Sequence, residues 1–385
     1  MYGIILAGGY GKRLMPLTKH KRKPFIEILG KPLFQYTIEY LYKAGITDLL
    51  IVGRPGDEFR TSYHFQIKTI PQDGSGEDDA IKKAYRYIKE EDYESPYIIT
   101  FTGFISTPPD IVKYALQYHY ESNYPNTIVV TPIVSGMETY GEVVISGDRV
   151  KGFKKEQGKT GYVFAGILLV NKQGLETIYN EGFAPGLNHL SKNNKLGVYI
   201  WSGEWIEIGY PWDLLEAGTV LLEYELGDNI KISKGAKVSP TTVIKGPVYI
   251  EENAFIDEEV YIQGPAYIGK NAFVGFSTYI RPYSIIEKNT IIGSRNEVKR
   301  SIIMQKTRTA TGVVVADTII GETCDIREYS IFQSSHITNL PPRIRDKVYY
   351  RHKKPKLGSI ISPNCTVGPL ARVDPGDIID CGNPS

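Results

Sequence analysis

Aliphatic side chains recur at every sixth position through much of the second half of the chain. The positions are Ile232, Val238, Ile244, Ile250, Ile256, Ile262, Ile268, Val274, Ile280, Ile286, Ile292, Val298 and Met304. Neither the helical period of 3.6 residues nor the strand period of two produces this spacing. A period of six predicts a parallel β-helix, in which each hexad forms one side of a triangular coil. The inward side chain is then aliphatic because successive coils stack directly on one another.

The six-residue register breaks and resumes twice. One later set comprises Val314, Ile320, Ile326 and Phe332, and another comprises Ile361, Val367, Val373 and Ile379. The breaks predict an irregular passage near 305–313 and a protruding loop near 336–358. This loop is rich in lysine and arginine, and we favour a solvated loop over a contact with a phosphate or a second subunit.

The first half of the chain alternates apolar runs with amphipathic segments. The predicted strands are 2–7, 48–53, 97–101, 127–134, 141–145, 162–170 and 196–201. The predicted helices are 31–44, 79–91, 108–121 and 211–225. This alternation predicts a mostly parallel, Rossmann-like α/β sheet that binds its ligand at the carboxyl ends of the strands. We expect two domains, 1–227 and 228–385.

A glycine-rich loop with cations follows the first predicted strand. It runs from Leu6 through Ala7, Gly8, Gly9 and Gly11 to Arg13, and Lys23 lies a little further on. Glycines let backbone N–H groups approach an anion closely, and the two cations supply charge where a phosphate would lie. A dinucleotide loop would need glycine at Leu14, and a Walker loop would need serine or threonine at Arg13. The pattern predicts a site for a nucleoside triphosphate.

Composition and net charge indicate which partners and which cellular location to expect. The formal net charge of the 385 residues is +2, so we expect no nucleic-acid or membrane partner. No basic region precedes the apolar N-terminal run, which therefore predicts a strand and not a signal peptide. The three cysteines, Cys324, Cys365 and Cys381, are far apart, which predicts no disulfide framework, no zinc site and a cytoplasmic location. Abundant tyrosine, isoleucine, lysine and glutamate give a weak indication of a thermophile.

The glycine-rich loop resembles the signature of the sugar-1-phosphate nucleotidyltransferases, G-G-x-G-x-R-L-x-P-L-T followed by K-P. The resemblance implies the joining of a sugar 1-phosphate to the α-phosphate of a nucleoside triphosphate, with release of pyrophosphate and help from Mg²⁺. It implies catalytic roles for Arg13 and Lys23 and a metal ligand at Glu207. The implied nucleotide-binding residues are Leu6, Ala7, Gly8, Gly9, Gly11, Gln72 and Gly76, and the implied sugar-binding residues are Gly141 and Glu156.

The chain departs from this family at the two carboxylates that normally hold the metal. Phe104 follows Gly103 where the family has aspartate, and Glu207 stands where the family has a second aspartate. Glutamate can still bind a cation, whereas phenylalanine cannot. The acidic run Glu77–Asp79 offers alternative ligands, but carboxylates also favour helix N-termini, and we favour that structural interpretation. On the sugar side, Phe164 replaces the family's asparagine.

The second half resembles the left-handed β-helix of bifunctional N-acetylglucosamine-1-phosphate uridylyltransferases and their archaeal relatives. The histidine that acts there as acetyltransferase base aligns with Thr311, and the following tyrosine aligns with Val314. Neither side chain present accepts a proton at neutral pH, so we expect no acetyl transfer. An acyltransferase with a relocated base is the least favoured alternative.

Two hypotheses carry similar weight. The first is a nucleotidyltransferase with impaired or altered metal-dependent catalysis, acting on a nucleoside triphosphate and a sugar 1-phosphate. The second is a catalytically degenerate subunit, a pseudoenzyme that binds a nucleotide or sugar nucleotide and regulates or scaffolds. For either one the resemblance implies a homotrimer, or a mixed oligomer with an active paralogue.

Overall fold

The computed structural model describes residues 1–91, 96–132, 141–154, 161–345 and 356–382. The chain divides into two compact units. The first comprises Met1–Tyr10, Lys23–Phe25 and Leu33–Glu207, and the second comprises Gly11–Arg22, Ile26–Pro32 and Ile208–Ser385. Within the described ranges, no helix has the length and apolar character needed to cross a membrane.

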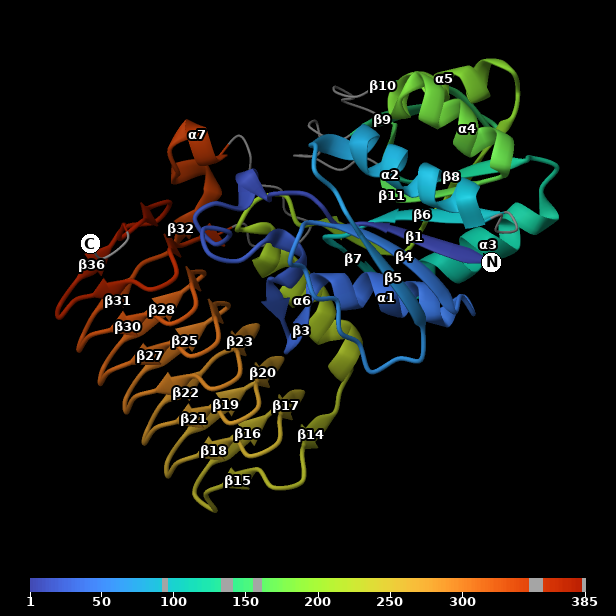
Figure 1. Ribbon diagram of the computed structural model, residues 1–385. Coiled ribbons are helices and arrows are strands. Elements are labelled where there is room, and N and C mark those ends of the chain that lie inside the picture. The colour runs from blue at the N-terminus through green and yellow to red at the C-terminus, as the bar shows by residue number, and fades with distance from the viewer. Residues whose placement is uncertain (92–95, 133–140, 155–160, 346–355, 383–385) are drawn as a thin grey trace. The chain divides into compact units, whose positions relative to one another are not determined.

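A nine-stranded sheet forms the centre of the first unit (Figure 1), in the order β5-β4-β1-β6-β11-β8-β12-β10-β9. Its strands are β1 (Tyr2–Leu6), β4 (Asp48–Gly53), β5 (Gln66–Pro71), β6 (Tyr97–Phe101), β8 (Asn126–Pro132), β9 (Glu142–Ser146), β10 (Arg149–Lys154), β11 (Tyr162–Val170) and β12 (Leu196–Ile200). All seven predicted strands are present. Strands β5, β4, β1 and β6 are parallel, as are β8 and β12. Of these nine strands only β11 and β10 run antiparallel to the others, so seven share one direction and the sheet is mostly parallel, as predicted.

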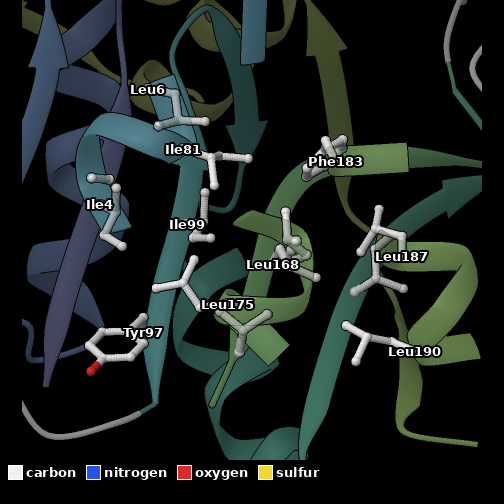
Figure 2. Packing of buried hydrophobic residues seen from close by; sticks show 14 of the residues in the cluster. Ile4, Leu6, Ile81, Tyr97, Ile99, Leu168, Leu175, Phe183, Leu187 and Leu190 are labelled. Carbon is white, nitrogen blue, oxygen red and sulfur yellow. The ribbon is translucent and has the colours of Figure 1, made fainter. Parts of the chain in front are cut away.

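Helices cover both faces of this sheet. They are α1 (Leu33–Lys43), α2 (Gly76–Glu91), α3 (Ile111–Glu121), α4 (Lys172–Glu181) and α5 (Phe183–Lys192), with the short η2 (Lys23–Phe25) beside them. Side chains of α2, α4 and α5 form one continuous core with alternate residues of the strands. Figure 2 shows Ile81 of α2 beside Ile99 of the sheet, and Leu187 and Leu190 of α5 together farther along the same core. The structure confirms α1, α2 and α3, whereas α4 and α5 were not predicted.

A two-stranded antiparallel ribbon completes the first unit. It pairs β7 (Phe104–Thr107) with β13 (Glu204–Glu207), and in this register Phe104 lies directly opposite Glu207. The two positions at which the resemblance implies metal-binding carboxylates are therefore cross-strand neighbours.

The second unit begins with short elements and one long helix. These are η1 (Lys12–Leu14), the hairpin β2 (Glu27–Ile28) and β3 (Lys31–Pro32), and α6 (Asp213–Leu226). Gly218 of α6 lies against Ile285 and Ile28, where an added Cβ would come within 2.5 Å of Ile285 Cδ1. The small residue thus lets the helix pack closely onto a β-helix face.

Three parallel sheets form the β-helix of this unit (Figure 1). The first contains β14 (Ile230–Ile232), β17 (Val248–Ile250), β20 (Ala266–Ile268), β23 (Ser284–Ile286), β26 (Ile302–Ile303), β29 (Ile319–Ile320), β34 (Ile360–Ile361) and β37 (Ile378–Ile379). The second contains β15 (Lys237–Val238), β18 (Phe255–Ile256), β21 (Phe273–Val274), β24 (Ile291–Ile292), β27 (Arg308–Thr309), β30 (Asp325–Ile326) and β35 (Thr366–Val367). The third contains β16 (Val243–Lys245), β19 (Tyr261–Gln263), β22 (Tyr279–Ile280), β25 (Glu297–Lys299), β28 (Val314–Ala316), β31 (Ile331–Phe332) and β36 (Arg372–Val373).

The predicted inward register holds as far as Val298 and then shifts by one residue. Ile303 stacks on Ile286 and joins the apolar core, so the prediction of Met304 at this position is wrong. The next inward residues are Thr309 and Val315, which corrects the prediction of Val314. The passage 305–313 is therefore a regular part of a coil. The aliphatic pattern did not include it because its inward residue is Thr309.

The predicted protrusion lies between β31 and β34. Its described part contains β32 (Ser335–His336), η3 (Ile337–Asn339), α7 (Pro342–Arg345) and β33 (Lys356–Leu357). Ile337, Leu340 and Leu357 pack with Trp212 in a small apolar cluster. The base of the protrusion is thus packed, while 346–355 lie outside the described residues.

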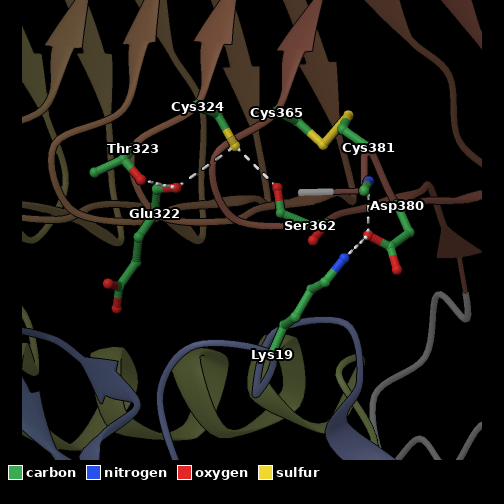
Figure 3. The surroundings of a disulfide bond; sticks show 9 residues. Lys19, Glu322, Thr323, Cys324, Ser362, Cys365, Asp380 and Cys381 are labelled. Atoms are coloured by element: carbon green, nitrogen blue, oxygen red, sulfur yellow. Dashed lines mark hydrogen bonds and ion pairs between the residues drawn. A yellow bond between two sulfur atoms is a disulfide. The ribbon is translucent and has the colours of Figure 1, made fainter. Parts of the chain in front are cut away.

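A disulfide joins Cys365 to Cys381 at the C-terminal end of the β-helix (Figure 3), with Cα atoms 5.4 Å apart. The prediction of no disulfide framework therefore missed this bond. The two cysteines are separated by 16 residues in sequence, close to one coil of the β-helix, so stacking makes them neighbours. The cysteine argument for a reducing compartment no longer holds, and intracellular disulfides are also known in hyperthermophiles.

Loss of this disulfide is expected to destabilise the last coil. Closing a loop of about 15 residues contributes about 3 kcal/mol. Thermal denaturation of a Cys381→Ser variant should show a melting temperature several degrees lower, and reductant should lower only that of the native chain. Alkylation after denaturation should label one cysteine without reductant and all three with it. Labelling of all three in both conditions would contradict the bond.

Candidate active site

A cavity of about 370 Å³ lies in the first unit, where β1 and β6 end. Its lining combines backbone of the glycine-rich loop, a few polar side chains and a wall of aromatic rings. The lining residues are Leu6, Gly8, Gly9, Lys23, Pro24, Gln72, Gly76, Glu77, Ala80, Phe101, Thr102, Gly103, Phe104, Gly141, Phe153, Phe164, Gly166, Phe183, Trp205 and Glu207. This is the edge of the sheet at which the strand–helix alternation predicts a ligand.

Arg54 holds the glycine-rich loop in place. Its Nε donates a hydrogen bond to the carbonyl oxygen of Gly8 at 2.8 Å, and its Nη1 donates to that of Gln72 at 3.0 Å. The guanidinium also lies 4.2 Å from the ring centroid of Tyr10. Arg54 is buried, so these acceptors replace the water that it loses. Sequence reasoning missed this residue, although a charged residue directly after the buried strand β4 is a usable indication.

Gln72 packs directly against the glycine-rich loop. A Cβ added to Gly8 would lie 1.7 Å from Gln72 Oε1, so any larger residue there would force the Gln72 side chain to move. The Gln72 amide donates to the carbonyl oxygen of Gly76 at 2.7 Å. One buried side chain therefore connects the two segments that the sequence assigns to the nucleotide.

Lys23 lies across the turn that joins β6 to β7. Its side chain passes over Gly103, where an added Cβ would lie 1.9 Å from Lys23 Cε, and Gly103 has a φ of +91°. The Lys23 ammonium is 3.9 Å from Glu207 Oε1. The cation predicted to contact phosphate is thus in the cavity and close to the one carboxylate predicted to bind metal.

Phe104 is held in a stack of aromatic rings. Its ring centroid lies 5.4 Å from that of Tyr40 and 6.2 Å from that of Trp205, and only 2% of the residue is exposed. Trp205 is anchored in turn by a hydrogen bond from its indole N–H to the carbonyl oxygen of Ala165 at 3.0 Å. A tightly packed ring therefore fills the position of the missing carboxylate.

The neighbouring acidic residues do not complete a metal site. Asp78 accepts a hydrogen bond from the backbone N–H of Phe183 at 2.6 Å, and Asp79 accepts one from that of Gly74 at 3.0 Å. These contacts support the interpretation of the acidic run as structural, at the N-terminus of α2. Across the described part of the chain, no three His, Cys, Asp or Glu residues come together in a way that could hold a metal ion. The residues present do not fit the two-carboxylate Mg²⁺ site that the resemblance implies, and the assignment of Glu207 as a metal ligand stays a prediction.

Four phenylalanine rings form one wall of the cavity. Each contacts its neighbours at centroid distances between 5.6 and 6.2 Å, and the members are Phe101, Phe153, Phe164 and Phe183. Phe153 also covers Gly141, where an added Cβ would lie 2.8 Å from its ring. The sugar side of the cavity therefore presents aromatic faces where the resemblance implies polar groups. Phe183 begins α5, a helix that the sequence did not reveal.

The cavity gathers most of the site residues predicted in the first unit. The residues brought together are Leu6, Gly8, Gly9, Lys23, Gln72, Gly76, Gly141 and Glu207. Ala7 is buried and its N–H bonds to the carbonyl oxygen of Val52, so it supports the loop from beneath. Gly11 and Arg13 belong to the second unit, where the Arg13 guanidinium lies 5.6 Å from the ring centroid of Tyr210. The predicted sugar ligand Glu156 lies outside the described residues.

Comparison with known proteins supports this description. The nucleotidyl transferase family matches residues 2–222, and the GMPPB C-terminal domain family matches residues 262–355. A bifunctional protein GlmU of Methanocaldococcus jannaschii is 32% identical over 98% of this chain and 91% of its own. A bifunctional sugar-1-phosphate nucleotidylyltransferase/acetyltransferase of Sulfurisphaera tokodaii is 27% identical over 99% of this chain and 97% of its own. A UDP-glucose pyrophosphorylase of Acinetobacter baumanii shares the fold, with a TM-score of 0.51 and 12% identity over 58% of this chain and 93% of that one.

These matches are long enough to assign the chain to a family. The first match spans more than half of the chain and contains the whole cavity. The relative from Methanocaldococcus jannaschii covers both units. The chain belongs to the nucleotidyl transferase family of sugar-1-phosphate nucleotidyltransferases.

Proposed function

We propose that the chain binds a nucleoside triphosphate and a sugar 1-phosphate in the cavity of the first unit and joins them into a nucleotide sugar. The observation that carries the proposal is the cavity lining, which places the glycine-rich loop and Lys23 together at the ends of β1 and β6. An oxygen of the sugar phosphate attacks the α-phosphorus, the bond to the β-phosphate oxygen breaks, and pyrophosphate leaves. Positioning and charge stabilisation provide most of the catalysis in such a transfer.

Each residue of the cavity has a definite task in this proposal. The Lys23 ammonium neutralises charge on the phosphoryl oxygens, and a charge-assisted hydrogen bond of this kind is stronger than a neutral one. Backbone N–H groups of Gly8 and Gly9 approach the triphosphate, and Arg54 keeps that backbone in position. Gln72 fixes the segment around Gly76. We also propose Arg13, which does not line the cavity, as a second cation for the triphosphate.

We expect slow turnover compared with relatives that have both carboxylates. Family members are typically Mg²⁺-dependent, and this cavity offers Phe104 at one of the two carboxylate positions. The same observation favours a second candidate function, a regulatory or scaffolding subunit that binds the nucleotide or nucleotide sugar without turnover.

A pyrophosphate-release assay separates the two functions. The purified chain is mixed with Mg²⁺, each common nucleoside triphosphate, and either glucose 1-phosphate or N-acetylglucosamine 1-phosphate. Nucleotidyl transfer predicts release that requires the sugar phosphate with one triphosphate and that disappears in Lys23→Met. Lys83→Met is the matched control, since Lys83 pairs with Asp73 and does not line the cavity. Silence with nucleotide binding intact favours the binding subunit, and absence of binding contradicts both functions.

We also propose a homotrimer or a mixed oligomer with an active paralogue, in the cytoplasm of a thermophile. One face of the β-helix supports self-association, because Phe255 is 41% exposed and stacks with Phe273 at 5.5 Å. Exposed Ile291 continues this row along the paired strands. Light scattering coupled to size exclusion should give a trimeric mass, and Phe255→Glu should reduce that mass. A monomer at all concentrations would contradict the homotrimer.

A further inference from the structure

We propose that the ammonium group of Lys23 takes the place of a divalent cation in the cavity of the first unit, so that nucleoside triphosphate binds there without Mg²⁺. This inference rests on the proposed function, because it concerns the same cavity and the same class of ligand. It goes further by assigning the charge-neutralising role to a side chain of the protein.

The ribbon of β7 and β13 shows where a metal would have been held. Residues directly opposite each other in an antiparallel pair have neighbouring side chains on the same face. The pairing of Phe104 with Glu207 therefore marks a place where two carboxylates would converge on one cation. At this pair of positions the chain has one carboxylate, and the ammonium group of Lys23 lies 3.9 Å from it, so a positive charge of the protein is already beside that carboxylate.

The position of Lys23 depends on the residue before Phe104. Gly103 has a φ of +91°, a conformation that favours glycine, and its missing side chain leaves the space that the Lys23 stem fills. Phe104, which stands in place of the carboxylate, therefore directly follows the glycine over which the Lys23 stem passes. A divalent cation bound to Glu207 would face the positive charge of Lys23 at short range with only one carboxylate of the pair to offset it, which disfavours it.

No other described carboxylate restores the missing ligand. Phe104 is locked between Tyr40 and Trp205. Asp78 and Asp79 are hydrogen-bonded to backbone groups of their own surroundings. Glu77 does line the cavity, but no group of three metal-ligating side chains forms among the described residues. A metal-free triphosphate, which is more negative than its Mg²⁺ complex, is also the form that a lysine attracts more strongly.

Calorimetric titration of the full chain with nucleotide, in excess EDTA and in excess MgCl₂, tests the inference. The probe is whichever of ATP, GTP, CTP, UTP and dTTP gives the largest thermal shift in either buffer. We expect a dissociation constant in EDTA no more than about threefold weaker than in Mg²⁺. Lys23→Met should weaken binding in EDTA about tenfold or more while the melting temperature without ligand stays within a few degrees. Lys83→Met should bind as the native chain does.

Each other result has a definite meaning. Binding that requires Mg²⁺ overturns the inference alone and leaves the proposed function standing. Native affinity of Lys23→Met in EDTA also overturns the inference, because the lysine then does not carry the charge. Absence of binding in both buffers overturns the proposed function and the inference with it.

Discussion

Replacing Phe104 with aspartate is expected to give the chain Mg²⁺-dependent pyrophosphate release well above that of the native protein. The register of β7 and β13 would place the new carboxylate directly opposite Glu207. Two converging carboxylates suit Mg²⁺, which binds in proteins through one or two carboxylates together with substrate phosphates. A metal ion contributes several kcal/mol of charge stabilisation in the transition state, so a gain of about 100-fold is expected. Initial rates of sugar-dependent pyrophosphate release, with and without EDTA, measure it.

Two matched variants separate the carboxylate from the loss of the ring. Removal of a large buried aromatic side chain costs about 3–5 kcal/mol, so all substitutions at Phe104 are expected to lower the melting temperature. Phe104→Asn has the shape of the aspartate variant without its charge, and Phe104→Ala opens the stack of Tyr40 and Trp205 alone. Only the aspartate variant should respond to Mg²⁺. Equal rates in Phe104→Asn and Phe104→Asp would show that space, and not a ligand, was missing.

The β-helix shows how far a periodic pattern can predict structure. The six-residue repeat identified the architecture, because every coil imposes the same demand on its inward residue. It failed at two positions. The inward residues there are Ile303 and Val315, whereas the pattern predicted Met304 and Val314. The inward spacing is five residues at two steps, Val298 to Ile303 and Val315 to Ile320, and the inward Thr309 hides the six-residue spacing between them. A pattern restricted to aliphatic residues cannot follow a one-residue deletion across a polar inward position.

The sequence did not predict helices α4 and α5, because both contain residues that disfavour helix formation. Gly174 and Gly186 are poor helix formers, and α5 also contains a proline. Each glycine serves close packing, because a Cβ on Gly186 would lie 2.8 Å from Ile178 Cα, and one on Gly174 would lie 2.1 Å from Asn126 Oδ1. Packing between helices overrides propensity here. The aromatic wall to which Phe183 contributes was consequently invisible in the sequence.

The candidate site likewise combines residues that the sequence predicted with contacts that it did not. Residues of the glycine-rich loop, Lys23 and Gln72 were predicted, because a local motif carries their chemistry. The pairing of Lys23 with Glu207, the support from Arg54 and the disulfide between Cys365 and Cys381 were not. These contacts join residues that are far apart along the chain, or one coil apart, and only the folded backbone brings them together.

Glu287 is a buried carboxyl group that no sequence pattern indicated. Its Oε2 accepts a hydrogen bond from the backbone N–H of Gly30 at 3.0 Å, which joins the β2–β3 hairpin to the β-helix within the second unit. Burial raises the pKa of Glu287 from its usual 4.5 to about 8, and the nearby carboxylates of Glu27 and Glu251 add to this rise. Lys288 pairs with Glu27 at 2.7 Å, so the cation on this side is already engaged with that carboxylate.

This raised pKa predicts that the second unit loses stability as the pH rises. The folded state binds a proton at Glu287 more tightly than the unfolded state does, so stability is highest below about pH 4.5 for this group and is lost progressively up to about pH 8. Each unit of pKa difference corresponds to about 1.4 kcal/mol, which gives an effect of a few kcal/mol over this window. Other groups titrate in the same range, and comparison with a variant isolates this one.

Glu287→Gln is expected to remove most of this pH dependence. Glutamine keeps an acceptor for the Gly30 N–H and cannot ionise, so the variant should melt several degrees above the native chain at pH 8.5 and near it at pH 5. Differential scanning calorimetry at four or five pH values between these limits measures the two curves. Glu287→Ala provides the contrast, because it leaves the Gly30 N–H without its acceptor and should be destabilised at every pH. Parallel curves for the native chain and Glu287→Gln would show that Glu287 keeps an ordinary pKa, and that hydration of the hairpin contact offsets its burial.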